Sequence, residues 1–151
     1  MIRSVLAVLA GIVVLTVTSF AIEWAADPLL LHLFPKALPN AGALSSNIYA
    51  TLFMYVYTAL CVAAGGYVTA WVARRSPAGH AAAMGLVELA LTVLAWRSLG
   101  HEAPLRNWIV GMVTVVPAAW CGGLLRARHI SGAAPSQGPA ESPRLSAFKS
   151  R

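Results

Sequence analysis

The amino-acid sequence predicts an all-α protein, an integral membrane four-helix bundle with antiparallel up-down topology. Hydrophobic residues make up 58% of the 151 residues and charged residues only 11%, whereas soluble domains carry about 45–50% apolar and about 25% charged residues. The mean hydropathy is +0.70, and four apolar runs are each long enough for a helix to cross a ~30 Å hydrocarbon layer. Because backbone amides find no water in that layer, such long runs must be helices rather than barrel strands.

The first predicted span covers residues 4–26. A cleaved signal peptide is the alternative, because Arg3 precedes the run and Ser19-Phe20-Ala21 offers small residues where a signal peptidase cuts. The run stays apolar beyond that point, and its removal would leave three spans with the two termini on opposite sides. We therefore expect a retained transmembrane helix.

Residues 27–47 are predicted to form an outer loop. Proline removes a backbone donor and disfavours the helix interior, so the first helix is expected to end near Pro28. The stretch 29–34 is then expected to lie on the membrane surface. The second helix needs a side chain that accepts its free N-terminal amides, and the candidates for this cap are Ser45, Ser46 and Asn47.

The remaining spans are predicted at 48–73, 79–99 and 105–125. The connections between them are short, so consecutive spans are expected to form hairpins. Together these elements give one transmembrane domain, 1–128. Residues 129–151 are rich in Ser, Gly and Pro, a composition typical of disorder, and are predicted to be a disordered cytoplasmic tail.

Basic residues predict the orientation of the chain. With both termini in the cytoplasm, the inner segments hold eight basic residues and the outer segments hold three, in agreement with the positive-inside rule. The inner ones are Arg3, Arg74, Arg75, Arg126, Arg128, Arg144, Lys149 and Arg151, and the outer ones are Lys36, Arg97 and Arg106. This distribution also explains the net charge of +6 without a nucleic-acid partner, and the lipid bilayer is the predicted partner instead.

Small residues predict where helices pack. Residues of low volume spaced four apart let helix backbones approach in lipid, and in some proteins such faces also join copies, so a homo-oligomer is one expectation. Pro117 removes a helix hydrogen bond and is expected to bend its span. The candidate packing residues are Gly65, Gly66, Ala70, Gly85, Pro117, Gly122 and Gly123.

Glu88 is the candidate intramembrane functional residue. It falls near the middle of the third span, where a charged side chain costs ~2.5–3.5 kcal/mol on insertion scales. It is therefore expected to face other helices, either as a proton- or cation-handling carboxylate or as a neutral acid that joins helices. Its candidate hydrogen-bond partners are Thr58, Tyr67 and Thr114.

Glu23 and Arg97 are a candidate ion pair. Both are predicted near the outer ends of their spans, at similar depth, and a structural pair is favoured over a binding site because interfacial charges also reach water.

No motif for catalysis, a cofactor or a metal ion is present in the sequence. Cys61 and Cys121 are predicted at depths that differ by roughly 10 Å at 1.5 Å per residue, beyond disulfide reach, and both are expected to be buried. The four histidines lie in predicted loops or at span ends and lack metal-ligand spacing. We therefore expect no catalytic, cofactor-binding or metal-binding residues and no enzymatic activity.

The segment 65–75, GGYVTAWVARR, is followed by His80-Ala81, Pro117-Ala118-Ala119 and Gly122-Gly123. This pattern resembles small four-helix bacterial inner-membrane proteins of uncharacterised function, over roughly the last three spans. The resemblance implies a multi-pass protein of the inner membrane, and it implies no substrate, cofactor or catalytic residue. Glu88 is not part of the pattern.

The sequence therefore leaves two functional hypotheses. The first is a structural or accessory membrane protein without enzymatic activity. The second is a small proton- or cation-coupled transporter or channel subunit that uses Glu88. A membrane enzyme would require a polar cavity lined by several converging side chains, which no sequence motif indicates.

Overall fold

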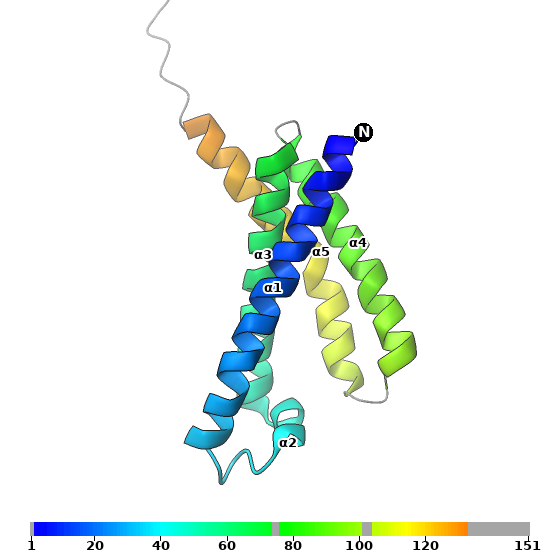
Figure 1. Ribbon diagram of the computed structural model, residues 1–151. Helices are drawn as coiled ribbons and strands as arrows, with labels where there is room; N and C mark the ends of the chain where they lie inside the picture. Colours follow the sequence, from blue (N-terminus) through cyan, green and yellow to red (C-terminus); the bar gives the residue numbers. More distant parts are fainter. Residues whose placement is uncertain (1, 74–75, 101–103, 133–151) are drawn as a thin grey trace, which may run out of the picture.

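The structure, a computed structural model, describes residues 2–73, 76–100 and 104–132. These residues form five helices and no strand (Figure 1), which confirms the predicted all-α bundle. The helices are α1 (Ile2–Leu33), α2 (Ala41–Ser46), α3 (Ile48–Ala73), α4 (Pro77–Leu99) and α5 (Leu105–Gly132).

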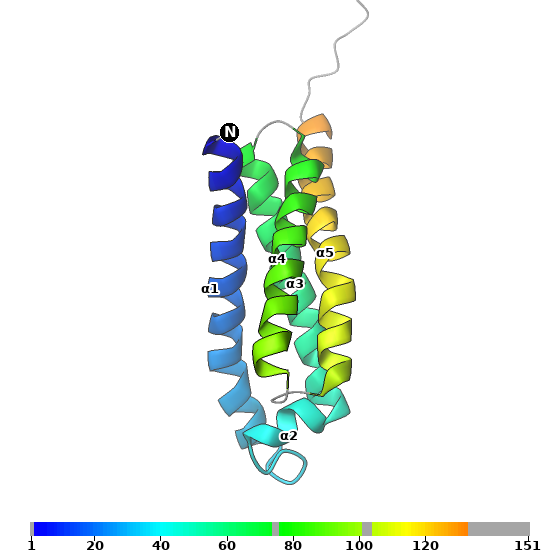
Figure 2. The ribbon, with the colours of Figure 1, turned by 90° about the vertical axis from the view of Figure 1, so that its right-hand side faces the viewer.

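Helix α3 is the centre of the bundle, since it packs against α1, α4 and α5. Helices α4 and α5 also pack closely on each other. The start of α1, the end of α3, the start of α4 and the end of α5 lie at one end of the molecule (Figure 2). We call this the basic end, after Arg3, Arg126 and Arg128. The short helix α2 lies at the opposite end, which we call the α2 end.

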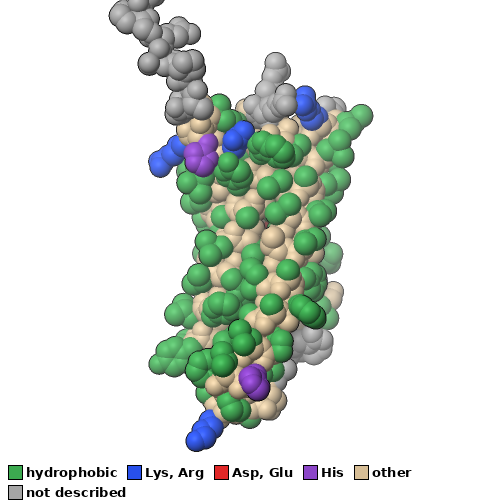
Figure 3. All heavy atoms as spheres, turned by 60° about the vertical axis from the view of Figure 1, so that its left-hand side comes forward, with side chains coloured by type: hydrophobic (Ala, Val, Ile, Leu, Met, Phe, Trp, Pro, Cys, Tyr) green, Lys and Arg blue, Asp and Glu red, His purple; other side chains and the backbone are tan. Residues whose placement is uncertain are grey.

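Four of the helices, α1, α3, α4 and α5, are long and apolar enough to cross a membrane, which supports a multi-pass membrane protein. Large apolar side chains such as Leu60 and Val113 are 65% and 68% exposed. Figure 3 shows hydrophobic side chains over most of one face, with Lys and Arg only at its two ends. Lipid explains this surface, because apolar side chains that would be unfavourable in water are solvated by acyl chains.

The prediction that the first helix ends near Pro28 is wrong. Pro28 lies inside α1, which continues to Leu33, so 29–33 is helical rather than a surface loop. Beyond the proline, Leu30 and Phe34 line a small apolar cavity together with Leu38 and Phe53. Pro28 removes only one helix hydrogen bond, a loss that transmembrane helices tolerate.

The fourth helix extends beyond the predicted span of 105–125. Helix α5 runs to Gly132, so residues 129–132, predicted to belong to a disordered tail, are helical, and the rest of the predicted tail, 133–151, lies outside the described residues. The last turns contact α3, because the Arg126 guanidinium lies 5.9 Å from the Tyr67 ring centroid and Tyr67 Oη lies 3.3 Å from His129 Nδ1. Pro117 lies within α5, and Figure 1 shows that the orange C-terminal part of this helix leans away from its yellow first part.

Asn47 is the residue that caps α3. Its side-chain Oδ1 accepts hydrogen bonds from the backbone N–H groups of Tyr49, at 3.0 Å, and Ala50, at 3.3 Å. One of the three predicted candidates thus satisfies amides that a helix N-terminus leaves unpaired. Cys61 and Cys121 are both free, as predicted, although Cys121 is exposed rather than buried.

Glycines set the helix contacts toward the basic end. A Cβ on Gly66 would overlap the backbone carbonyl of Ala119, and one on Gly122 would overlap that of Ala63, so α3 and α5 meet backbone to backbone. The glycine-packed half, as we call this region, also includes α1 and α4 through contacts of Gly11 with Gly65 and Thr69, of Gly85 with Ala119, and of Gly123 with Ala81. Ala70 is fully buried in the same half.

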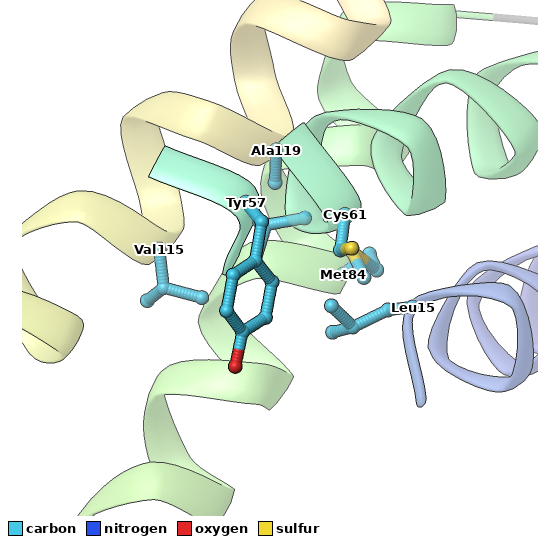
Figure 4. Packing of buried hydrophobic residues seen from close by; sticks show 7 residues of the cluster. Leu15, Tyr57, Cys61, Met84, Val115 and Ala119 are labelled. Atoms are coloured by element: carbon cyan, nitrogen blue, oxygen red, sulfur yellow. The ribbon is translucent and has the colours of Figure 1, made fainter. Parts of the chain in front are cut away.

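Below this half, an apolar cluster forms the centre of the bundle. Its buried members include Leu15, Tyr57, Cys61, Met84 and Val115. Figure 4 shows the Tyr57 ring among these side chains, with its hydroxyl oxygen pointing away from Ala119. The cluster therefore separates the glycine-packed half from the polar region described next.

Candidate functional site

A partly enclosed cavity of about 530 Å³ lies between α1, α3, α4 and α5, toward the α2 end. Its volume is within the range of about 300–1,000 Å³ that is common for small-molecule sites. We call it the central cavity. Its apolar and aromatic wall residues are Leu15, Phe20, Met54, Tyr55, Ala59, Val62, Trp108, Gly111 and Val115, and its other wall residues are Thr16, Ser19, Glu23, Ser45, Thr58, Glu88, Thr92, Asn107 and Thr114.

Two carboxylates, Glu23 of α1 and Glu88 of α4, line this one cavity. Their relative depth follows from Gly65, where a Cβ would lie 3.2 Å from Leu15 Cβ and 2.9 Å from Met84 Cε, so Leu15 and Met84 share a level. Glu88 follows Met84 by about one turn and Glu23 follows Leu15 by about two. Glu23 therefore lies ~6 Å nearer the α2 end.

Glu88 is only partly buried, and it occurs eleven residues after the start of α4 at Pro77, or ~16 Å along the helix. Two of its candidate partners, Thr58 and Thr114, line the same cavity. The third, Tyr67, lies instead beside His129 at the basic end. In the described part of the chain no group donates a hydrogen bond to the Glu88 carboxylate. The nearby Thr92 Oγ1 donates instead to the backbone carbonyl of Glu88, at 2.9 Å.

Glu23 is held by a tyrosine. Tyr57 Oη donates a hydrogen bond of 2.9 Å to Glu23 Oε1, and Tyr57 is buried, so this bond joins α1 to α3 in a site of low polarity. The predicted ion pair with Arg97 is not formed within the described ranges, and the Arg97 side chain is exposed. Depth alone suggested that pair, whereas the rotation of α1 about its axis determines which group Glu23 meets.

The α2 end of the cavity is fixed by further polar contacts. Tyr55 Oη donates a hydrogen bond of 2.8 Å to Asn107 Oδ1 and so joins α3 to α5. Arg106 Nη2 donates to the backbone carbonyls of Ser45, at 3.2 Å, and Ser46, at 3.4 Å. Because Ser45 lines the cavity, these bonds hold α2 beside its outer part.

Sequence reasoning missed Ser19, Thr92, Tyr55 and Asn107 as parts of a site. A signal for them exists in their spacing: Thr16, Ser19 and Glu23 recur at helical intervals in α1, as do Tyr55 and Thr58 in α3, Glu88 and Thr92 in α4, and Asn107, Gly111 and Thr114 in α5. Residues three or four apart share a helix face. Each span therefore carries a polar stripe, and the four stripes meet at the central cavity.

The chemistry of the wall favours positive charge. No Lys, Arg or His of the described residues lines the cavity, and two carboxylates in surroundings of low polarity attract a cation more strongly than they would in water. The wall also holds one donor without an acceptor in the described ranges, the buried Trp108 Nε1, which can bond an acceptor atom of a ligand but adds nothing to the attraction for positive charge. The described residues include no group of three or more His, Cys, Asp or Glu that would hold a metal ion.

The predicted packing residues occupy a different region. Gly65, Gly66, Gly85, Gly122 and Gly123 lie at contacts between helices of a single chain, and they do not line the central cavity. These glycines therefore contribute to helix packing, and the candidate functional residues lie in the other half of the bundle, around the central cavity.

Comparisons with known proteins identify no relative: no family model, no curated protein and no solved structure matches the chain.

Proposed function

We propose that this protein is a small membrane transporter or channel subunit that binds and moves a cation through the central cavity. The observation that carries the proposal is that Glu23 and Glu88, on two different helices, line one cavity. An intramembrane carboxylate is costly to bury and is most often kept for a function. Two such groups, ~6 Å apart in depth, offer successive positions for a proton or another cation.

The absence of a donor to the Glu88 carboxylate among the described residues also supports this function over a structural role. A Glu that only joined helices would have its oxygens occupied by donors from neighbouring helices. The Glu88 carboxylate has no such donor in the described part of the chain: Thr58 and Thr114 line the same cavity, but Thr114 Oγ1 donates to the backbone carbonyl of Val110. A structural or accessory role is the alternative, and the flux experiment below discriminates the two.

Proton flux in proteoliposomes tests the proposal. Vesicles that contain the wild-type protein and a trapped pH-sensitive dye are expected to change internal pH faster than empty vesicles when a membrane potential is imposed. Glu88→Gln is expected to lower the rate to that of empty vesicles, because the amide cannot carry a proton or pair with a cation. Asp27→Asn is the matched control, since it also removes one acidic group but Asp27 does not line the cavity.

Equal rates of pH change for vesicles with wild type, vesicles with Glu88→Gln and empty vesicles would show that the protein does not move protons. The same vesicles with K⁺ or Na⁺ gradients and ion-selective dyes then test the remaining cations. If no cation moves in a Glu88-dependent way, the structural or accessory role replaces this proposal.

The location that we propose is a bacterial inner membrane, with both termini in the cytoplasm. By sequence, the residues at the start of α1, between α3 and α4, and from Arg126 onward include eight Lys and Arg, whereas the segments near the α2 end include three, Lys36, Arg97 and Arg106. The positive-inside rule supports a cytoplasmic basic end, because basic segments resist translocation. The Glu23 level of the cavity would then be nearer the outer surface.

A further inference from the structure

The central cavity is larger than a proton or an inorganic ion requires. Its volume of about 530 Å³ is that of a site for a small organic molecule. A site for a small bare cation instead surrounds the ion closely with oxygen ligands. The described residues provide two carboxylates and no third acidic, His or Cys ligand beside them.

The wall of the cavity also has two distinct parts. Aromatic and aliphatic side chains, including Phe20, Tyr55, Trp108 and Met54, make most of its surface, and the carboxylates of Glu23 and Glu88 provide its negative charge. Aromatic faces attract cations within about 6 Å, and best when water is excluded. An apolar body and a positive charge are thus both accommodated, whereas an anion would find no basic partner among the described wall residues.

From these observations we propose that the central cavity binds an organic cation with an apolar, aromatic body, paired with the Glu88 carboxylate. This inference rests on the proposed cation-binding function of the same cavity and names its substrate class. Glu88 is the primary partner because its carboxylate has no donor in the described part of the chain. Glu23 already accepts the Tyr57 hydroxyl and serves as the second, outer group.

The geometry provides a test that does not alter charge. Gly111 lines the cavity, and a Cβ added there would meet no atom within 4 Å. Gly111→Leu therefore fills part of the volume while both carboxylates remain. The volume that remains in this variant is too small for an organic cation but sufficient for a small inorganic ion.

Binding of tetraphenylphosphonium to the full chain in lipid nanodiscs is the experiment, with empty nanodiscs as the blank for partitioning into lipid. Tetraphenylborate, which has nearly the same size and the opposite charge, is the matched probe. We expect saturable binding of the phosphonium and none of the borate. Glu88→Gln is expected to weaken phosphonium binding about 30-fold or more, the effect of removing one member of a close charge pair.

Gly111→Leu is expected to weaken the same binding about tenfold or more, since an overfilled site costs at least ~1.4 kcal/mol. The control for it is Ala64→Leu, which adds the same side chain at an exposed position of α3. Helical circular dichroism and the elution volume of each variant establish that it is folded. A variant that fails this criterion is replaced by Gly111→Val or Glu88→Asn.

The outcomes separate this inference from the proposed function. Absence of saturable phosphonium binding, equal binding of both probes, or unchanged binding in Gly111→Leu would each overturn the organic-cation site. If any of these occurs while proton or metal-cation flux still requires Glu88, the proposed function stands and only the substrate class is wrong. Glu88-dependent phosphonium binding without any flux would support the site and overturn transport.

Discussion

The two halves of the bundle use the same helices in opposite ways. In the glycine-packed half, Gly66 and Gly122 bring the backbones of α3 and α5 into contact, and the residues that they meet, Ala119 and Ala63, have small side chains. In the other half, around the central cavity, Glu23, Tyr57 and Glu88 project from helices that enclose about 530 Å³ of space. Close packing in one half thus permits a hollow in the other, because the helices are already held in register.

The difference between the two halves indicates which residues stabilise the fold and which are available to bind a ligand. Lipid solvates apolar side chains as well as a neighbouring helix does, so helix association depends on close backbone approach and on hydrogen bonds. The glycine contacts provide the first and the tyrosine contacts near the cavity provide the second. Substitutions in the glycine-packed half are therefore expected to affect folding, and substitutions at the cavity are expected to affect binding first.

The largest effect is expected from one added methyl group in the glycine-packed half. Gly66→Ala places a Cβ on the backbone carbonyl of Ala119, and neither backbone can move without separating α3 from α5. We expect the free energy of unfolding to fall by about 3 kcal/mol, the upper part of the range for overpacked cores. Unfolding in mixed micelles with increasing SDS, followed by circular dichroism, measures this change.

The matched control is Gly111→Ala at the cavity, where the same methyl group meets no atom within 4 Å. We expect its stability to equal that of the wild type or to exceed it by up to ~1 kcal/mol, because alanine favours helix over glycine. Equal losses in the two variants would contradict the division of the molecule into a packed half and a hollow half.

An intermediate effect is expected at the hydrogen bond that connects the cavity to the apolar cluster. Tyr57→Phe keeps the ring and removes the hydroxyl that donates to Glu23, which is expected to lower the free energy of unfolding by ~1.5–2.5 kcal/mol, the lower part of the range for a hydrogen bond to a charged group. The same SDS titration measures it. Tyr49→Phe is the control, because Tyr49 is 80% exposed. An equal loss of stability in Tyr49→Phe and Tyr57→Phe would show that the hydrogen bond from Tyr57 to Glu23 does not stabilise the bundle.

The spans were predictable from the sequence because hydropathy is a local property that lipid acts on directly. All four apolar runs form long helices in the structure, and Asn47, one of the three predicted candidates, caps α3. The helix through Pro28 was not predictable from local propensity, since proline disfavours a helix interior and α1 nevertheless continues to Leu33. Propensity is a weak guide where the surroundings of a helix override it.

The candidate site was predictable only in part. Glu88 was identifiable alone, because any carboxylate in the middle of a span is unusual. Its association with Glu23 depends on the rotation of α1 and α4 about their axes, which depth along the chain does not specify. The polar stripes of α1, α3, α4 and α5 contain that rotational information, and comparing their phases would have indicated a shared cavity.

The smallest effect is expected from a substitution of Arg97. This substitution tests whether Glu23 interacts with Arg97, its predicted partner, or with Tyr57, its observed partner. Arg97 is exposed and forms no ion pair within the described ranges, so Arg97→Gln is expected to change the free energy of unfolding by less than ~0.5 kcal/mol. Two double-mutant cycles sharpen the point. Glu23→Gln combined with Tyr57→Phe is expected to give a coupling energy of ~1 kcal/mol, and Glu23→Gln combined with Arg97→Gln a coupling energy near zero. A larger coupling to Arg97 would mean that Glu23 turns toward the membrane surface in lipid, and the cavity would then contain Glu88 as its one carboxylate.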